Sequence, residues 1–332
     1  MFNIINFVHI GMMKSATTYV QGVWHKDNNY NLIHQEIADL VYEIRNIVVN
    51  DSEDKKVESS INRPRSIKGS IDVLSFESLS TAFLNNMSQQ FKIPNYIRLI
   101  SRELNRNIET ENILLTIREP ISWIKSIYIQ SIKQGNTGSA QEFINKQENF
   151  IKHSLDLRML VENYSKYFNN MLILPLEILK QDEDLFWNVI SDAFDLPPMQ
   201  TRINEKLNTS LDLDRTYILS KMNGFSKLMM STLSQANHFQ SLKEKQHLIN
   251  AHNQNEKWVH RRFVENATDE EVEQMYSFFG EQRTNEDFFS FDLTERLKES
   301  IQKNYIDYLR ENTIPEIADD YQHKFDEFLS KK

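Results

Sequence analysis

The sequence predicts an α/β protein in which a parallel β-sheet is flanked by helices. Short apolar runs rich in β-branched residues recur along the chain, and stretches with helical periodicity separate them. Each run also ends at polar or charged residues. Strands joined by helical crossovers are parallel, and ligands bind beyond their carboxyl ends in such sheets. The ends of the apolar runs are therefore the first places to look for function.

The first strand and the turn after it begin the predicted fold. Residues 3–10 are mainly β-branched and aromatic, which predicts a strand. Gly11 then starts a polar turn, and residues 16–24 have the pattern of the beginning of a helix. The first residues contain no basic start, long apolar run or small-residue cleavage site, so we expect a strand there and not a signal peptide.

Three further strands are predicted by apolar runs with polar ends. They are residues 71–76, 112–117 and 171–176, and a helical stretch at 184–194 follows the last of them. Their nearly continuous hydrophobicity is typical of parallel strands that are buried on both faces.

Two regions depart from this pattern. Residues 50–70 are charged and poor in apolar residues, which predicts a mobile surface insertion. From residue 294, apolar residues at helical spacing predict two amphipathic helices, through Leu297, Ile301, Tyr305, Tyr308, Ile317, Tyr321, Phe325 and Phe328. We expect a main domain of residues 1–293 and a helical extension of residues 294–332. The extension packs on the core or, alternatively, forms a homodimer contact.

Composition narrows the classes of function. A chain of 332 residues can bury an enzyme-sized core, and the absence of cysteine excludes disulfides, zinc–thiolate sites and thiol nucleophiles. No apolar window is long enough to span a membrane, so we expect a soluble, cytoplasmic protein. A net charge of −9 argues against broad binding of nucleic acid, so any anion site must be local. The nine histidines are scattered and predict no metal site.

The turn after the first strand has the composition of an anion-binding loop. In HIGMMKSATTY, a glycine, a lysine and three hydroxyl residues lie between a strand and a helix. Backbone N–H groups at a helix start, together with the charge of Lys14, attract phosphate. The alternative is that Ser15 and Thr17 only cap the helix while Lys14 is solvated. The loop lacks the glycine that precedes the lysine in a Walker A motif.

A second motif follows the third predicted strand. Arg118 stands at its end, Pro120 fits the first turn of a new helix, and Ser126 lies on the polar stripe of that helix. An arginine fork and a serine hydroxyl can grip a terminal phosphate. A surface arginine beside a half-exposed serine is the alternative.

Together these segments resemble the sulfotransferases that use 3'-phosphoadenosine-5'-phosphosulfate (PAPS), especially bacterial members acting on carbohydrates and small molecules. The loop resembles the family's 5'-phosphosulfate loop, commonly KxGTTxLQ, with Ala16 where the family has glycine. The segment LLTIREPISWIKSIYIQ is similar to the family's 3'-phosphate strand and helix, which implies that Arg118 and Ser126 hold that phosphate. The first similarity implies nucleotide contacts from Gly11, Lys14, Ser15, Ala16, Thr17 and Thr18.

Two later stretches extend the resemblance. Residues 172–196, with Glu177, and residues 204–211, with Asn208 and Ser210, are similar to elements that follow in the family. The Arg-Lys-Gly loop of many animal members has no clear counterpart, and either basic residues among 257–262 replace it or nothing does. The resemblance implies a P-loop-like fold and transfer of a sulfuryl group from PAPS to a hydroxyl or amine of a carbohydrate or small-molecule acceptor. The nucleotide product is 3'-phosphoadenosine-5'-phosphate (PAP).

The expected chemistry needs a cation for the leaving group and a base for the acceptor. Lys14 is the expected cation, because negative charge develops on the bridging oxygen of the nucleotide. Glu77, at a predicted strand end, is the first candidate for the base, ahead of His34 and Glu36. The alternative for Glu77 is a residue that only complements a helix dipole. A P-loop kinase and a non-catalytic nucleotide-binding protein are the competing functions.

Overall fold

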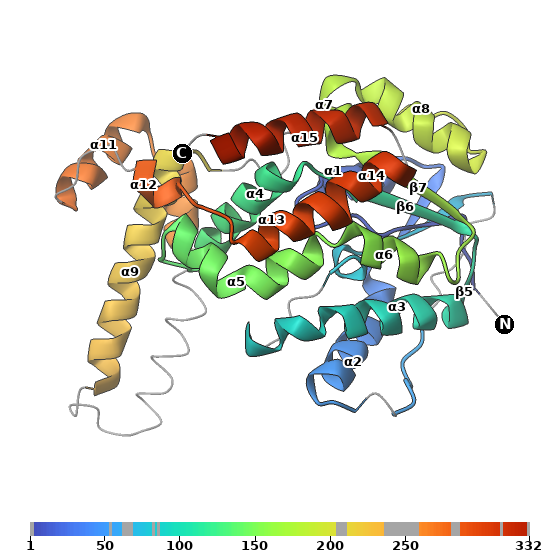
Figure 1. Ribbon diagram of the computed structural model, residues 1–332, viewed down its shortest axis with the longest axis horizontal. Helices are drawn as coiled ribbons and strands as arrows, with labels where there is room; N and C mark the ends of the chain where they lie inside the picture. Colours follow the sequence, from blue (N-terminus) through green and yellow to red (C-terminus); the bar gives the residue numbers. More distant parts are fainter. Residues whose placement is uncertain are drawn as a thin grey trace. The chain divides into compact units, whose positions relative to one another are not determined.

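The computed structural model confirms the α/β class and describes residues 3–52, 55–61, 69–81, 84, 87–203, 211–235, 259–279, 286–312 and 315–330. Its main sheet has the strand order β3-β4-β2-β6-β7, and every pair of neighbours is parallel (Figure 1). The strands are β2 (Phe7–His9), β3 (Tyr30–Ile33), β4 (Ile71–Ser75), β6 (Asn112–Ile117) and β7 (Asn170–Pro175). The three later predicted strands therefore lie within a residue of their expected bounds.

The first predicted strand is divided in two. Asn3–Ile4 forms β1 and pairs with β5 (Ile108–Glu109) in a separate small sheet, whereas Phe7–His9 enters the main sheet. Strand β3 is absent from the sequence analysis, because its four residues include a polar asparagine and follow closely on a helix. Of the predicted insertion, residues 53–54 and 62–68 lie outside the described residues.

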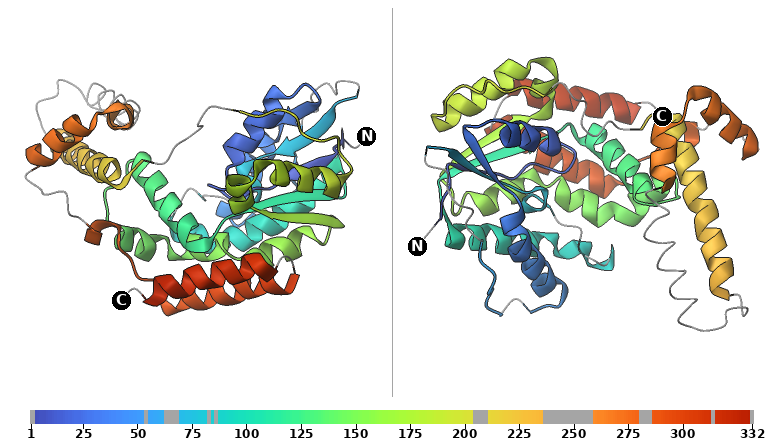
Figure 2. Two further views of the ribbon diagram at one scale, coloured as in Figure 1. Left: turned by 90° about the horizontal axis from the view of Figure 1, so that it is seen from above. Right: turned by 180° about the vertical axis from the view of Figure 1, so that it is seen from behind.

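Two compact units make up the described chain. The first falls within residues 1–124, 147–208 and 293–332 and contains the main sheet. Its helices cover both faces of the sheet (Figure 2). They are α1 (Thr17–Lys26), α2 (Ala38–Val49), α3 (Ile93–Asn107), α6 (Leu157–Tyr164), α7 (Leu176–Gln181), α8 (Glu183–Phe194) and the C-terminal helices, together with the starts of α4 (Pro120–Lys133) and most of α5 (Ala140–Ser154).

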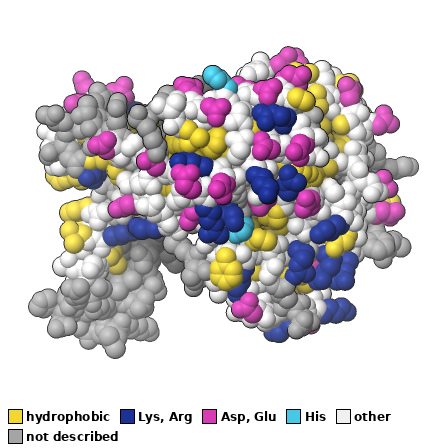
Figure 3. Space-filling view, in the orientation of Figure 1, with side chains coloured by type: hydrophobic (Ala, Val, Ile, Leu, Met, Phe, Trp, Pro, Cys, Tyr) yellow, Lys and Arg dark blue, Asp and Glu magenta, His cyan; other side chains and the backbone are white. Residues whose placement is uncertain are grey.

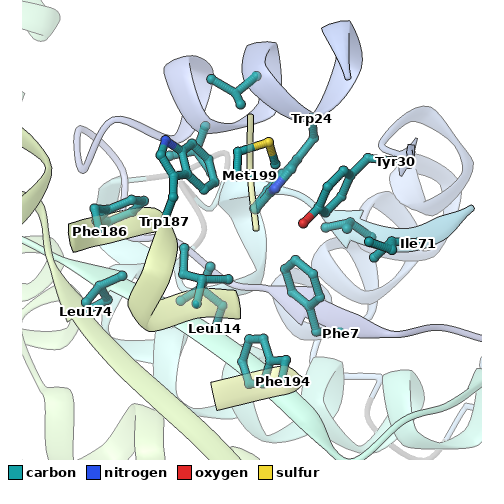
Figure 4. Close-up of a cluster of buried hydrophobic side chains, with 14 of the residues drawn as sticks. Phe7, Trp24, Tyr30, Ile71, Leu114, Leu174, Phe186, Trp187, Phe194 and Met199 are labelled. Carbon is teal, nitrogen blue, oxygen red and sulfur yellow. The ribbon is translucent and has the colours of Figure 1, made fainter. Parts of the chain in front are cut away.

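An aromatic core joins α1 and α8 to one face of the sheet (Figure 4). The rings of Trp24 and Trp187 meet edge to face, with centroids 6.2 Å apart. Phe7 of β2 contacts Trp24 in the same way and stacks on Phe194 at 5.1 Å. Burial of such large side chains supplies much of the free energy that holds a helix on a sheet. It thereby fixes the start of α1 at the carboxyl end of β2.

The predicted C-terminal helices are present in the first unit. They are α13 (Glu295–Ile301), a π-helical turn (Gln302–Ile306), α14 (Asp307–Asn312) and α15 (Pro315–Ser330). Six of the eight predicted apolar positions are buried, and Ile317 and Phe328 are half-buried. Basic and acidic side chains lie interspersed on the face that Figure 3 shows. On the C-terminal helices, Arg310 of α14 pairs with Asp319 of α15 at 3.1 Å. The helices therefore pack on the core, and a homodimer contact stays a prediction.

The second unit falls within residues 125–146 and 209–292. It contains α9 (Leu213–Gln235), a helix at 259–266, α11 (Asp269–Phe278) and α12 (Glu286–Phe289), besides the end of α4. Tyr217 stacks on Tyr276 with centroids 5.6 Å apart, and Asn223 donates to the carbonyl oxygens of Ile132 and Asn136. Across both units, no helix in the described ranges has the length and apolarity needed to cross a membrane.

Candidate anion-binding and catalytic site

The loop between β2 and α1 is held by hydrogen bonds to its carbonyl oxygens. Its backbone first continues the pairing with β6, because Met12 N–H donates to the Thr116 carbonyl at 2.9 Å. One side chain of the loop and three from other elements then donate to the carbonyl oxygens of four successive loop residues. Ser80 donates to Gly11 O at 3.0 Å, Ser15 to Met12 O at 2.5 Å, Trp123 to Met13 O at 2.7 Å and Arg118 to Lys14 O at 3.0 Å. The carbonyl oxygens thus face protein donors.

The start of α1 has the geometry of an anion site. Lys14 and Ala16 both adopt positive φ, at 64° and 61°, so the turn contains left-handed residues of the kind that form anion-binding concavities. Ala16 is the N-cap, and no side chain of the described residues caps the helix through it. The first N–H groups of a helix have no partner within the helix, and the positive end of its dipole lies beside them. This end of α1 therefore suits a phosphate or sulfate group.

The predicted hydroxyl groups take different positions. Ser15 and Thr17 are buried, and Thr18 is exposed. The Ser15 hydroxyl contacts Met12 O and the Thr116 hydroxyl, and Thr17 Oγ1 reaches Met12 O at 3.4 Å. Ser15 therefore fixes the loop from within, while Thr18 lies on the exposed side of the first helical turn. The sequence could not distinguish these orientations.

Three candidates for catalysis gather at the neighbouring strand ends. Lys14 follows β2, Glu77 follows β4 and His34 follows β3, and these strands are adjacent in the sheet. Burial raises the pKa of the Glu77 carboxyl, and the nearby positive charges of Lys14 and His34 oppose that rise. The order of the strands therefore places these three predicted catalytic residues at one edge of the sheet.

The hydrogen bonds of His34 define its protonation. His34 Nδ1 lies 2.8 Å from the Ser75 carbonyl oxygen, which can only accept. Nδ1 therefore carries a proton, and a neutral His34 keeps its lone pair on Nε2. Glu36 is differently placed, because its carboxylate accepts the His34 backbone N–H at 3.0 Å within the same turn. Glu36 is thus already engaged in local structure.

Arg118 lies at the end of β6 and contacts the anion loop directly. Its Nε donates to Ser122 at 2.7 Å, while its Nη1 donates to the Lys14 carbonyl at 3.0 Å. Burial lowers the pKa of Arg118, and the carboxylates of Glu177 and Glu119 oppose this effect. Ser126 is buried further along α4, in the second unit, so its pairing with Arg118 stays a prediction.

Lys180, which lies near Arg118, and Lys324, which lies near Lys180, were missed in the sequence. Burial, Arg118 and Lys324 lower the pKa of Lys180, whereas Glu177 raises it. Lys180 lies on α7 and Lys324 on α15, so only tertiary packing brings these charges together. Among the basic residues expected at 257–262, positions 257 and 258 lie outside the described residues, and Arg261 binds Glu265 at 2.7 Å in the second unit. Asn208 and Ser210 also lie outside the described residues.

The C-terminal helices support this site with two buried tyrosines, which sequence reasoning also missed. Tyr305, on the π-helical turn, donates to the Arg118 carbonyl at 2.7 Å. Tyr321, on α15, donates to Glu177 at 2.6 Å. Single π-helical turns are frequent at functional sites because they shift the side chains that follow. The described residues contain no group of three or more histidine, aspartate or glutamate side chains arranged to hold a metal ion.

The chain was compared with protein families, curated proteins and solved structures. No protein-family model matches the sequence, and no curated protein matches it. A solved structure described as a sulfotransferase from Alicyclobacillus acidocaldarius superposes with a TM-score of 0.45 and 10% sequence identity. The match covers 69% of this chain and 93% of that one.

Proposed function

We propose that the chain is a sulfotransferase that moves a sulfuryl group from PAPS to a hydroxyl or amine of a carbohydrate or small-molecule acceptor and releases PAP. The observation that carries this proposal is the contact between two cation-bearing segments. The loop that leads into the uncapped start of α1 carries Lys14, and Arg118 donates to the carbonyl oxygen of that same lysine. A nucleotide with phosphate at both ends requires two such cationic positions on one rigid support.

The proposed roles divide between the two positions. The N–H groups at the start of α1, Lys14 and the Thr18 hydroxyl would hold the 5'-phosphosulfate. Arg118 would hold the 3'-phosphate, with Lys180 as a second cation, because the two charges lie close enough for Arg118 to lower the pKa of Lys180. Such a cluster of like charges becomes more favourable when an anion binds. Ser126 keeps the 3'-phosphate role that the resemblance implies, as a prediction.

The chemistry proposed is an in-line displacement at sulfur. The acceptor oxygen or nitrogen forms a bond to sulfur while the bond between sulfur and the bridging phosphate oxygen breaks. Lys14 neutralises the charge that develops on that bridging oxygen. Glu77 accepts the proton that the acceptor loses, and the protonated carboxyl later returns it to water.

Glu77 is the preferred base for a physical reason. Burial raises its pKa, which strengthens it as a base, and the neighbouring Lys14 opposes that rise and so favours the ionised form. His34 is the alternative, because its Nε2 can accept a proton. Glu36 ranks third, because its carboxylate is already occupied by a hydrogen bond from the backbone N–H of His34. Comparing Glu77→Gln, His34→Asn and Glu36→Gln would rank the three.

Titration calorimetry with three nucleotides tests the proposal. We expect PAP to bind more tightly than adenosine 5'-phosphosulfate, which lacks the 3'-phosphate, and ATP with magnesium to bind weakest. Arg310→Ala is a matched control, because Arg310 is an exposed arginine whose partners are Asp307 and Asp319. Preferential binding of ATP with magnesium would favour the kinase alternative and overturn the proposal. Binding of PAP without transfer to any acceptor would favour a non-catalytic nucleotide-binding protein.

A further inference from the structure

A buried histidine lies directly beneath the anion loop. His9 is the last residue of β2 and is fully buried. Its Nδ1 lies 2.8 Å from the Ser75 hydroxyl of β4, and its Nε2 lies 3.0 Å from the Thr116 hydroxyl of β6. The imidazole therefore bridges the two strands on either side of its own. None of the roles proposed above uses this side chain.

The donors and acceptors between His9 and the anion loop can be assigned, because the series of contacts ends at a carbonyl oxygen. The Ser15 hydroxyl lies 2.5 Å from the Met12 carbonyl oxygen, which only accepts, so Ser15 donates its single proton there. Thr116 lies 2.9 Å from Ser15 and must then donate to it. With the Thr116 proton committed, His9 Nε2 must be the donor to Thr116. His9 is thus an Nε2–H imidazole on this side.

The Nδ1 atom of His9 accepts a hydrogen bond on the other side of the ring. Burial lowers the pKa of His9 to about 3, so the ring is neutral near pH 7 and its Nδ1 accepts. Ser75 therefore donates to His9, and the Ser75 oxygen accepts from the Gln21 amide at 3.0 Å. Gln21 and His34 thereby meet at Ser75, because the His34 Nδ1–H group donates to the carbonyl oxygen of the same residue at 2.8 Å. One directed chain thus runs from the neighbourhood of His34 to the anion loop.

Close packing leaves this chain little freedom. A Cβ atom added at Gly11 would lie 2.5 Å from Thr116 Oγ1 and 2.6 Å from His9 Nε2, closer than real Cβ contacts. Gly11 therefore allows the loop to lie directly on the bridge. Movement of either hydroxyl partner of His9 would displace the loop backbone or the Gln21 side chain.

We propose that His9 is a positioning residue that holds the anion loop through Thr116 and, on its other side, holds Ser75, to which both Gln21 and His34 donate. The ring contacts no substrate atom in this role. It sets the two halves of the site in one arrangement, so that the nucleotide and the base meet at the same distance in each turnover. The catalytic part of this inference rests on the proposed function, whereas the hydrogen-bond pattern does not.

Two substitutions of His9 separate its contact with Ser75 from its contact with Thr116. The asparagine amide lies the same number of bonds from Cα as Nδ1, so His9→Asn keeps the contact to Ser75 and loses the contact to Thr116. The glutamine amide corresponds to Nε2, so His9→Gln keeps Thr116 and loses Ser75. Thr116→Val and Ser75→Ala remove the same two contacts from the partner side. His9→Asn should therefore behave like Thr116→Val, and His9→Gln should behave like Ser75→Ala.

The expected result is an opposite order of effects. For His9→Asn and Thr116→Val, we expect PAP affinity to fall about three- to tenfold, which is the effect of one lost hydrogen bond, and to fall by more than kcat does. For His9→Gln and Ser75→Ala, we expect kcat at saturating PAPS to fall by more than PAP affinity does. Amide hydrogen exchange of residues 10–18 should accelerate in the first pair more than in the second. If all four variants changed PAP affinity, kcat and amide exchange only in proportion to their loss of thermal stability, the proposal would be wrong.

Nitrogen NMR tests the bridge without any reaction. Histidine labelled with ¹⁵N should show His9 as a neutral Nε2–H tautomer between pH 5 and pH 8, and the signal is assigned by its loss in His9→Gln. An Nδ1–H tautomer, or titration of His9 within that range, would overturn the proposal. If the wild type bound no PAP while the tautomer and the exchange order were as expected, the proposed function would fail and the bridge would stand.

Discussion

Replacing Ala16 by glycine tests the strain in the anion loop. Ala16 has φ 61° and ψ 20°, a left-handed conformation that costs a residue with a Cβ about 1–2 kcal/mol. Glycine adopts it freely but loses roughly 0.4–1 kcal/mol more conformational entropy on folding. The difference predicts that Ala16→Gly raises the free energy of unfolding by about 0.5–1 kcal/mol.

A matched control isolates the backbone effect. Ala193 has helical backbone geometry in the last turn of α8 and packs against the aromatic core, so Ala193→Gly should lower the free energy of unfolding by about 0.5–1 kcal/mol. Urea unfolding of both variants, followed by circular dichroism, measures the two changes. The shifts in midpoint should have opposite signs. If both variants were destabilised equally, Ala16 would not be strained and the loop geometry argued above would be incorrect.

Further predictions concern the charged groups of the site. Lys14→Ala should lower kcat far more than PAP affinity, because the charge it neutralises appears mainly in the transition state; equal losses in single-turnover kinetics and calorimetry would contradict this. Arg118→Ala should weaken PAP binding about 10- to 100-fold, as expected for a lost charge-assisted hydrogen bond, and Lys180→Ala less. Lys180→Ala should leave binding of adenosine 5'-phosphosulfate nearly unaffected. Arg118→Ala should weaken it less than it weakens PAP binding, because Arg118 also holds the Lys14 carbonyl; equal losses for both ligands would remove the 3'-phosphate assignment. Glu77→Gln should lower the rate roughly 10²- to 10⁴-fold and abolish the acidic limb of the pH–rate profile. Since the folded-state pKa of Glu77 is raised above 4.5, the folded protein binds this proton more tightly and loses stability as pH rises through the raised value. Glu77→Gln should therefore increase thermal stability at neutral pH and do so less at acidic pH, and no difference between the two would show that Glu77 is not buried as described.

Strands that are buried on both faces could be predicted from the sequence. Residues 112–117 form a continuous apolar run that ends at Arg118, so strand and strand end were both predicted correctly. Strand β3 was missed because four residues give too short a pattern to distinguish from a turn. The division of the first strand depends on pairing with β5, which is distant in sequence.

Residues of the candidate site could be predicted from the sequence only where they follow a strand. Lys14, Glu77 and Arg118 all follow predicted strands, and parallel topology brings such positions to one edge. Lys180 approaches Arg118 through the packing of α7 and α15, and Tyr305 reaches Arg118 from a π-helical turn. No local periodicity encodes these contacts. The orientation of Ser15 and the bridging role of His9 likewise depend on Thr116, which is more than one hundred residues away.

Release of PAP from PAPS tests the central claim most directly. The purified protein would be incubated with PAPS and a panel of sugars, lipid-linked glycans and phenols, and PAP would be quantified by chromatography beside the Lys14→Ala and Arg310→Ala variants. We predict acceptor-dependent PAP formation, transfer of labelled sulfur to that acceptor, near-complete loss of both in Lys14→Ala and retention in Arg310→Ala. Equal PAP formation by wild type and Lys14→Ala would contradict the account, because the anion loop at the start of α1 would then have no part in the reaction.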